Sequence, residues 1–353
     1  MTTDQETNRP SPRSVSVLGA GAWGTTLAIL ATEAGHRVTL IAHSESAAKH
    51  LQQFRFHPTS LPGISVPSSI EVTHVGQHLD DETGVVVVAT PTQKLRESLQ
   101  PIAEIIRDKV ILSAVKGLEL DTYLRPSEVI ASVLGAATRI AVLSGPNLSS
   151  EIAMGRPATT VIAASRAELA ASLIELFHSQ RFRVYVSDDV TGVEFGGALK
   201  NIIAIGAGIA DGLAAGDNAK AAFMTRGIAE IARLGVACGA QPMTFAGLSG
   251  IGDLMATCSS PLSRNYRVGL ALSRGTDLDD ILGSMHEVAE GVPTTKAARN
   301  LGQFHGVDLP IVDQMYRVLF EGVAPREAIV RLMERDPKHE LLDLMPDSSV
   351  LGN

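Results

Sequence analysis

The sequence contains few cysteines and few aromatic residues. Only two of its 353 residues are cysteine, and 4% are aromatic. Cys238 and Cys258 form no CxxC pair and have no histidine cluster nearby, so neither a disulfide framework nor a structural zinc site is expected. This cysteine usage fits a reducing compartment, and we expect a cytoplasmic protein that holds no metal.

An excess of positive charge and a membrane-spanning stretch are also absent. The chain has 30 lysines and arginines against 38 acidic residues, a formal charge of −8, so nucleic-acid binding is not expected. Met1–Arg13 lacks the apolar core of a signal peptide. The longest apolar stretch, Ile202–Ala215, is interrupted by Asp211 and is too short to cross a bilayer. We expect no membrane insertion, and an anionic ligand would need a local cluster of cations and backbone N–H groups.

Up to Ser187, the sequence alternates between short apolar runs and segments with a helical pattern. Continuous apolar runs are typical of parallel strands that are buried on both faces. The segment Thr25–Ala34 is predicted to be a helix ended by Gly35, and Phe54–Ser68, with three prolines, is predicted to be an ordered loop. The predicted strands are Ser14–Leu18, Arg37–Ile41, Val85–Ala89, Val110–Leu112, Ile140–Leu143, Thr159–Ala163 and Arg183–Val186.

After Ser187 the pattern becomes helical, over Thr191–Ala215, Ala219–Cys238 and most of Ile281–Glu334. The predicted fold class is α/β, with a Rossmann-type dinucleotide-binding domain followed by an all-helical C-terminal domain that carries the substrate and catalytic groups. The predicted division is a disordered N-terminus at 1–13, the Rossmann domain at 14–187, the helical domain at 188–336 and a flexible tail at 337–353.

A glycine motif stands between the first predicted strand and the first helix. Gly19, Gly21 and Gly24 have GxGxxG spacing, and the strand–turn–helix context makes the motif informative. Gly19 would allow the tight turn, Gly21 the approach of a pyrophosphate and Gly24 close packing of helix on strand. The phosphates would rest on the helix N-terminus, where unpaired N–H groups favour negative charge. The alternative is a glycine-rich turn that binds nothing.

The end of the second strand bears on the choice between NAD and NADP. An acidic residue there normally binds the ribose hydroxyls of NAD and repels the 2′-phosphate of NADP. His43 occupies this place, and Glu45 lies slightly beyond it. Because a histidine does not exclude the phosphate, we expect NADP to be accepted, with NAD also an option. The alternative is that His43 is only a solvated loop residue.

Polar residues follow two further strands. Lys116 comes shortly after the strand at Val110–Leu112, and Gly145 and Asn147 follow the strand at Ile140–Leu143. Ligands of open α/β sheets bind beyond the carboxyl ends of the strands. Lys116 is therefore placed to meet an anionic or carbonyl group, although it could be an ordinary surface lysine.

Lys200 lies in a long helix that is otherwise apolar and rich in small residues. A lysine desolvated in such a helix should have its pKa lowered toward neutrality, which suits a general acid or base. The alternative is a lysine whose stem crosses apolar surface while its ammonium reaches water. The residues alone leave both interpretations open.

Two segments further along could complete a site for an anion. Asp253 ends the glycine-rich run Gly247–Gly252 and could hold the lysine ammonium, or it could cap the following helix. Arg264 lies between Ser263 and Asn265, and an arginine with two neighbouring donors suits a phosphate. The alternative for this triplet is a solvated helix start that is capped by Ser263.

Taken together, these segments resemble the bacterial-type NAD(P)-dependent glycerol-3-phosphate dehydrogenases. The resemblance runs from about Val15 to about Leu332, and the lysine helix and the SRN triplet in this order are its most specific parts. The fold it implies is 6-phosphogluconate-dehydrogenase-like. The matching motifs are GAGAWG, LPG at Leu61–Gly63, VKGLE, SGPN, GGALKNIIAIGAGIADGL, GLSGIGDLMATC, SRNYRVG and EVAEGVPTT.

The resemblance implies roles for individual residues. Lys200 would transfer the proton, and Lys116 would contact both substrate and cofactor. The glycerol phosphate site would be lined by Lys116, Gly145, Asn147, Lys200, Asp253, Thr257, Ser263, Arg264 and Asn265. Besides the motif glycines, the dinucleotide would be bordered by Ala22, Trp23, His43, Lys116, Ser149, Arg264, Val288 and Glu290. The backbone is expected to matter more than the side chain at Ala22, Trp23, Asn147 and Ser149.

The implied reaction interconverts dihydroxyacetone phosphate and sn-glycerol 3-phosphate for glycerophospholipid synthesis, with NAD or NADP and without a metal. Two alternatives stay open. One is another lysine-dependent hydroxyacid dehydrogenase of the same architecture, and the other is a non-catalytic NAD(P)-sensing module. The apolar helical domain, rich in glycine and alanine, is compatible with a homodimer.

Overall fold

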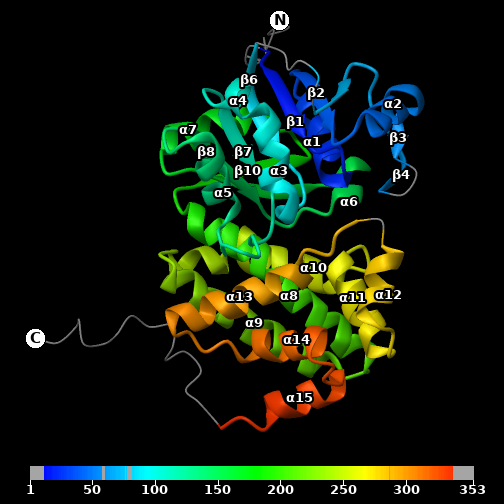
Figure 1. Cartoon of the computed structure of the whole chain (residues 1–353), viewed down its shortest axis with the longest axis vertical. Coiled ribbons are helices and arrows are strands. Elements are labelled where there is room, and N and C mark those ends of the chain that lie inside the picture. The colour runs from blue at the N-terminus through cyan, green and yellow to red at the C-terminus, as the bar shows by residue number, and fades with distance from the viewer. Residues whose placement is uncertain (1–11, 58–59, 76, 78–81, 286, 337–353) are drawn as a thin grey trace, which may run out of the picture.

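The computed structural model describes residues 12–57, 60–75, 77, 82–285 and 287–336. Figure 1 shows a sheet-containing part above a helical part. The predictions of a disordered N-terminus at 1–13 and of a flexible tail at 337–353 lie outside the described residues, apart from Pro12 and Arg13. Arg13 donates through its backbone N–H to His36 Nδ1 at 3.2 Å and through Nη1 to the Ser172 carbonyl oxygen at 2.8 Å.

The upper part is built on an eight-stranded sheet in the order β10-β9-β8-β7-β6-β1-β2-β5. Neighbouring strands are parallel except for β8 and β9. The strands are β1 (Ser14–Leu18), β2 (Arg37–Ala42), β5 (Glu71–His74), β6 (Thr83–Val88), β7 (Val110–Ser113), β8 (Arg139–Ser144), β9 (Ala158–Ala163) and β10 (Phe182–Ser187). All predicted strands are therefore confirmed. β5 was missed because this edge strand alternates with polar residues and has no continuous apolar run.

Helices cover both faces of this sheet and bury two apolar clusters against it. They are α1 (Ala22–Glu33), α2 (Glu45–Phe54), α3 (Leu95–Leu99), α4 (Ala103–Ile106), α5 (Pro126–Leu134), α6 (Ser149–Ala153) and α7 (Ala167–Leu173). α1 begins three residues before the predicted start, inside the glycine motif. The predicted stop is confirmed, since Gly35 follows the helix with a φ of 95°.

The prediction of a loop at Phe54–Ser68 is wrong in part. β3 (Phe56–His57) and β4 (Leu61–Ser65) pair antiparallel as a separate two-stranded sheet. Both members of such a sheet are edge strands, where proline and glycine are tolerated because one side of the backbone needs no partner. Pro62 and Gly63, which suggested a loop, lie within β4.

The lower part is helical and is organised around α8 (Val190–Gly212), which Figure 1 shows in the middle of it. Every residue from Gly192 to Ala210 is buried. By length and composition α8 could cross a membrane, but in this fold that stretch is wholly covered by protein. The other helices are α9 (Asp217–Ala237), α10 (Asp253–Ser259), α11 (Arg264–Ser273), α12 (Leu278–Ser284), α13 (Gly291–His305), α14 (Pro310–Phe320) and α15 (Pro325–Met333), with short turns at Pro242–Ala246 and Leu248–Gly252.

Glycines let α8 and α11 approach backbone to backbone. A Cβ on Gly208 would lie 2.1 Å from the Tyr266 carbonyl oxygen, and one on Gly269 would lie 1.8 Å from that of Ile205. Neither distance is tolerable, so these two glycines are required by the packing. This explains why the longest apolar stretch of the sequence is interrupted by glycine.

The carboxyl ends of the parallel strands β1, β6, β7 and β8 meet at one edge of the sheet, which faces the helical part (Figure 1). The strand order reverses between β1 and β6, which is where doubly wound sheets bind dinucleotides. The proposed domain division at 187/188 falls in the connection from β10 to α8.

Candidate active site

The glycine turn after β1 is tightly packed on one side. Gly19 has a φ of 110°, and a Cβ there would lie 2.7 Å from the Ala89 carbonyl oxygen. A Cβ on Gly24 would lie 1.8 Å from the Gly19 carbonyl oxygen. These two glycines therefore make the turn and allow α1 to sit against the strands.

Gly21 differs from them because, apart from its chain neighbours and the backbone of α1, no atom of the described residues lies within 4 Å of the place that its Cβ would take. Gly21 is the N-cap residue of α1, and no side chain caps this helix or places an acidic group in its first turn. Open space beside uncapped backbone N–H groups suits a pyrophosphate. The residues present thus fit a dinucleotide cofactor.

This difference gives a matched pair of substitutions. Gly21→Ala should leave the thermal unfolding temperature nearly unchanged, because its backbone φ of −80° suits alanine, while the Kd for NAD(P)H rises by about tenfold since the methyl group takes the space of the phosphates. Gly24→Ala should destabilise the fold by about 1–3 kcal/mol through overpacking. Thermal melts and cofactor titrations of both variants check this, and equal cofactor affinity in Gly21→Ala and wild type would contradict it.

The other predicted cofactor residues surround this turn or face it from the helical part. Ala22 and Trp23 open α1, and the Trp23 indole Nε1 is buried without a partner among the described residues. His43 follows β2 and is exposed, whereas Glu45 begins α2 and pairs with Lys49 at 2.8 Å. Both side chains of this pair are largely exposed (71% and 63%), so the ion pair is weak and leaves the Glu45 carboxylate open to another partner.

Ser149 and Glu290 connect different elements around the same region. The Ser149 carbonyl oxygen accepts a hydrogen bond from Thr26 Oγ1 in α1 at 3.3 Å. Glu290 Oε1 accepts from the Thr92 backbone N–H at 2.8 Å, which joins the helical part to the segment after β6. Burial raises the pKa of the Glu290 carboxyl. Val288, two residues earlier, is 44% exposed.

Lys200, Lys116 and Asp253 form one buried cluster although they are far apart in the sequence. Lys200 Nζ donates to Asp253 Oδ1 and, at 2.6 Å, to Thr257 Oγ1. Lys116 Nζ donates to Asp253 Oδ2 at 2.7 Å and to the Gly145 carbonyl oxygen at 3.0 Å. One carboxylate therefore holds two ammonium groups.

The environment of Lys200 changes its acidity. Its side chain is 8% exposed, so the interpretation in which the ammonium reaches water is wrong. Burial lowers the pKa of Lys200 to about 8, with Asp253 opposing this shift and the charge of Lys116 adding to it. An amine with this pKa exchanges protons near neutral pH, as a general acid or base must.

The structure decides between the two interpretations of Asp253. It is the first residue of α10, and the N-cap position is taken by Gly252. Both of its oxygens face lysines instead. Ser263 is different, because its hydroxyl accepts from the Tyr266 backbone N–H at 3.2 Å and caps α11, as the alternative interpretation held.

The two asparagines predicted to line the substrate site are both held by side-chain hydrogen bonds. Asn147 Nδ2 donates to the Thr159 carbonyl oxygen at 2.9 Å, and Asn147 Oδ1 accepts from Thr160 Oγ1 at 3.0 Å. Its side chain is therefore held by β9, and the expectation that its backbone would matter more for ligand contact stays a prediction.

Asn265 Nδ2 donates to Asn201 Oδ1 at 2.9 Å, and Asn265 Oδ1 accepts from the Gly291 backbone N–H at 2.9 Å. Asn201 was not predicted as a site residue, although it directly follows Lys200 in the same motif. Through Asn201 and Gly291, the Asn265 amide joins α11 to α8, next in sequence to Lys200, and to the start of α13.

Arg264 has an ion-pair partner that the sequence analysis also missed. Its Nη1 lies 3.4 Å from Glu287 Oε2, with the two side chains 39% and 26% exposed. A pair this exposed is weak, so it leaves the guanidinium available to an anion. Among the described residues, no group of three or more His, Cys, Asp or Glu side chains is placed to hold a metal ion.

Comparison with known proteins identifies the family. The model of the NAD-dependent glycerol-3-phosphate dehydrogenase N-terminus matches residues 14–170, and that of the C-terminus matches residues 189–330. The chain belongs to this family of glycerol-3-phosphate dehydrogenases. The resemblance on which the sequence analysis relied is thereby confirmed, as are the Rossmann-type and helical parts of the predicted fold.

Individual relatives of the family cover nearly the whole chain. A glycerol-3-phosphate dehydrogenase [NAD(P)+] of Chlorobium phaeobacteroides (strain BS1) is 46% identical over 330 residues, 93% of this chain and 99% of that one. The crystal structure of the Coxiella burnetii glycerol-3-phosphate dehydrogenase has a TM-score of 0.86 at 34% identity, covering 92% of this chain and all of that one. That of Saccharomyces cerevisiae GPD1 has a TM-score of 0.76 at 25% identity, with the same coverage.

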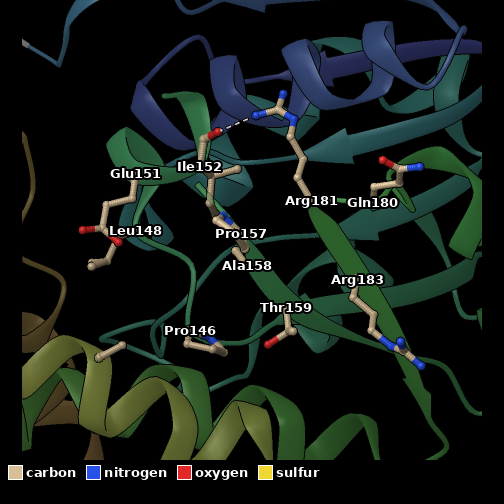
Figure 2. A pocket seen from close by; sticks show the side chains of 11 residues that line it. Pro146, Leu148, Glu151, Ile152, Pro157, Ala158, Thr159, Gln180, Arg181 and Arg183 are labelled. Atoms are coloured by element: carbon tan, nitrogen blue, oxygen red, sulfur yellow. Dashed lines mark hydrogen bonds between the residues drawn. The ribbon is translucent and has the colours of Figure 1, made fainter. Parts of the chain in front are cut away.

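A pocket of about 440 Å³ lies outside the lysine cluster of this dehydrogenase (Figure 2). Pro146 and Thr159 line it, and both adjoin Asn147, which follows Pro146 in the chain and donates to the Thr159 carbonyl oxygen. Arg181 and Arg183 also line it, but Figure 2 shows their side chains pointing in opposite directions. Arg181 donates to the Ile152 carbonyl oxygen at 3.0 Å. The two cations do not converge on one ligand.

Proposed function

We propose that the protein catalyses the reversible reduction of dihydroxyacetone phosphate to sn-glycerol 3-phosphate with NAD(P)H, with Lys200 as the proton-transfer residue. The family supports the reaction, and the observation that supports the residue is the buried cluster in which Asp253 holds Lys200 and Lys116. Glycerophospholipid synthesis is the proposed use of the product.

The chemistry divides between the cofactor and the side chains. The bound nicotinamide supplies or accepts the hydride. The Lys200 ammonium protonates the oxygen at C2 as the alcohol forms, and the neutral amine takes this proton back in the oxidation. Lys116 adds positive charge beside the same oxygen, and such electrostatic stabilisation is usually worth several kcal/mol. Asp253 keeps both amines in place.

The substrate phosphate is proposed to lie at Arg264, with Ser263 and Asn265 as neighbours. Arg264→Ala should raise the KM for dihydroxyacetone phosphate by about tenfold to a hundredfold, because it removes a bidentate donor to the phosphate, with a smaller change in kcat. Glu287→Ala, which removes only the ion-pair partner of Arg264, is the matched control. Steady-state kinetics check this, and a change in kcat alone would argue against a phosphate-binding role.

The pH dependence follows from the pKa of Lys200 near 8. Reduction needs the ammonium form, so kcat for dihydroxyacetone phosphate should fall as the pH rises through about 8. Oxidation needs the neutral amine, so kcat for glycerol 3-phosphate should rise over the same range. The expected result is that kcat for reduction falls and kcat for oxidation rises over the same pH range. If kcat changed in the same direction with pH for both reactions, another group would carry the proton.

The function is tested by initial rates for dihydroxyacetone phosphate with NADH and with NADPH. We expect turnover with both, because His43 stands where a carboxylate would repel the 2′-phosphate. A panel of hydroxyacids tests the alternative dehydrogenase, and absence of any turnover would support the NAD(P)-sensing module. A cytoplasmic location and a homodimer are also part of this proposal, and light scattering of the purified protein tests the dimer.

A further inference from the structure

A second buried charge lies on α8, near its start. Glu194 is 5% exposed, and its carboxylate accepts hydrogen bonds from the Ser127 backbone N–H at 2.8 Å and from Ser127 Oγ at 2.6 Å. It also pairs with Arg125 Nη1 at 2.7 Å. Ser127 is the second residue of α5 (Pro126–Leu134). A carboxylate from the helical part thus caps a helix that covers the sheet, where the helix dipole favours negative charge.

The same end of α8 then makes two close contacts before it reaches Lys200. A Cβ on Gly196 would lie 2.5 Å from the Ser249 carbonyl oxygen, and a Cβ on Gly197 would lie 2.4 Å from Ser144 Oγ at the end of β8. Lys200 follows Glu194 by six residues, about 9 Å along the helix axis. The position of its ammonium therefore depends on how the first two turns of α8 are held.

The lysine cluster is assembled from both parts of the molecule. Lys116 follows β7 in the sheet part, whereas Lys200 and Asp253 belong to α8 and α10 in the helical part. Asp253 can hold both ammonium groups only while the sheet part and the helical part keep the same position relative to each other. The Glu194 contacts to α5 cross the same boundary.

We propose that Glu194 is a positioning residue: by tying the start of α8 to α5, it sets the distance of the Lys200 ammonium from Lys116 and Asp253. This inference rests on the proposed function, because it assumes that Lys200 transfers the proton. Glu194 itself touches neither Lys200 nor the predicted substrate residues in any described hydrogen bond or ion pair.

The chemistry of the pair supports a positioning role over a purely stabilising one. Burial of a carboxylate is costly and raises the pKa of Glu194, while Arg125 and the Ser127 donors oppose that shift. Buried ion pairs are weak sources of net stability, but leaving either partner alone in the interior is strongly disfavoured, so Arg125 and Glu194 resist separation. Arg125 is also bound by Glu128 at 2.8 Å, on the more exposed side of α5.

The test compares Glu194→Gln with Glu128→Gln. Each replaces one carboxylate at Arg125 by a neutral amide, but only the first weakens a contact between α5 and α8, since Glu128 bonds to Arg125 at the start of α5 itself. We expect Glu194→Gln to lower kcat by about tenfold to a hundredfold, the size of effect that a displacement of about 1 Å can cause, with KM values nearly unchanged. The apparent pKa in the kcat profile should also shift. Glu128→Gln should keep wild-type values, and Glu194→Asp should restore part of kcat.

A structural role alone would give a different result. It would lower the melting temperature of Glu194→Gln but leave kcat and its pH profile at wild-type values at temperatures well below that melting temperature. This result would overturn the proposal. If Glu194→Gln does not fold, Ser127→Ala takes its place with the same expectations and the same overturning result. It removes the hydroxyl that donates to Glu194 at 2.6 Å and accepts from Arg125 Nη1 at 3.5 Å, and it keeps the Glu194–Arg125 ion pair.

A crystal structure of the variant separates this inference from the proposed function. We expect Asp253 to lose one of its two lysine contacts in Glu194→Gln, and this readout does not need turnover. An unchanged arrangement of Lys116, Asp253 and Lys200 would overturn the inference. Lack of turnover in the wild-type protein would instead overturn the proposed function.

Discussion

Replacing Lys200 with alanine should lower kcat for dihydroxyacetone phosphate reduction by about 10²- to 10⁴-fold, the range supplied by one general acid. Cofactor affinity should change little, because the glycine turn and α1 lie in the sheet part and make no contact with this side chain in any described hydrogen bond or ion pair. The measurement is stopped-flow or steady-state oxidation of NAD(P)H, together with a cofactor titration on the same preparation.

Two further results make this prediction specific. Lys220→Ala removes a lysine that pairs with Asp211 at 2.6 Å and makes no described hydrogen bond or ion pair with Lys116, Lys200 or Asp253, and it should retain wild-type kcat. A small primary amine added to Lys200→Ala should restore part of the activity by entering the space of the lost side chain. Near-normal turnover without added amine would show that the proton comes from another group.

Replacing Asp253 with asparagine should lower kcat nearly as much as Lys200→Ala does, but for a different reason. The carboxylate contacts both lysines, and its charge raises the pKa of Lys200 against the effects of burial and of Lys116. Without it, two ammonium groups face each other with no anion between them, so the pKa of Lys200 should fall below 8. The ammonium donor is then lost at a lower pH.

The expected result for Asp253→Asn is a loss of kcat of about a hundredfold at neutral pH, a size typical of lost general-acid catalysis. The pH at which kcat for reduction falls to half its maximum should also shift to a more acidic value. Asp279→Asn, at an exposed position near the start of α12, is the control and should change neither. A pH profile that loses amplitude but keeps its midpoint would mean that Asp253 does not govern the acidity of Lys200.

Several features could be predicted from the sequence because their signals are local. β6, β7 and β8 show continuous apolar runs, and the other predicted strands are rich in β-branched residues. β5, which lacks both signals over any length, was missed. The glycine motif was recognised from its spacing between a strand and a helix. The hairpin of β3 and β4 was missed because Pro62 and Gly63 signal a break, and only the absence of a second neighbour for β4 makes them acceptable there.

The candidate site was predictable as a set of residues but not as an arrangement. Lys200 stands out as a charge in an apolar helix, yet the residues alone left open whether its ammonium is buried. Asp253 carried two interpretations, capping or holding a lysine, and the local sequence fits both. Glu194, Asn201 and Glu287 gave no local signal, because each acts through a partner in another element.

By itself, the sequence determined the α/β class, the nucleotide turn and which charged residues lie in apolar surroundings, since each of these is written in the spacing of neighbouring residues. Only the tertiary structure decided that one carboxylate holds two lysines. Lys116 and Asp253 are 137 residues apart, and no pattern within either segment specifies the other. Their meeting depends on the packing of α8 and α10 against the edge of the sheet, where burial gives the Lys200 amine a pKa near 8.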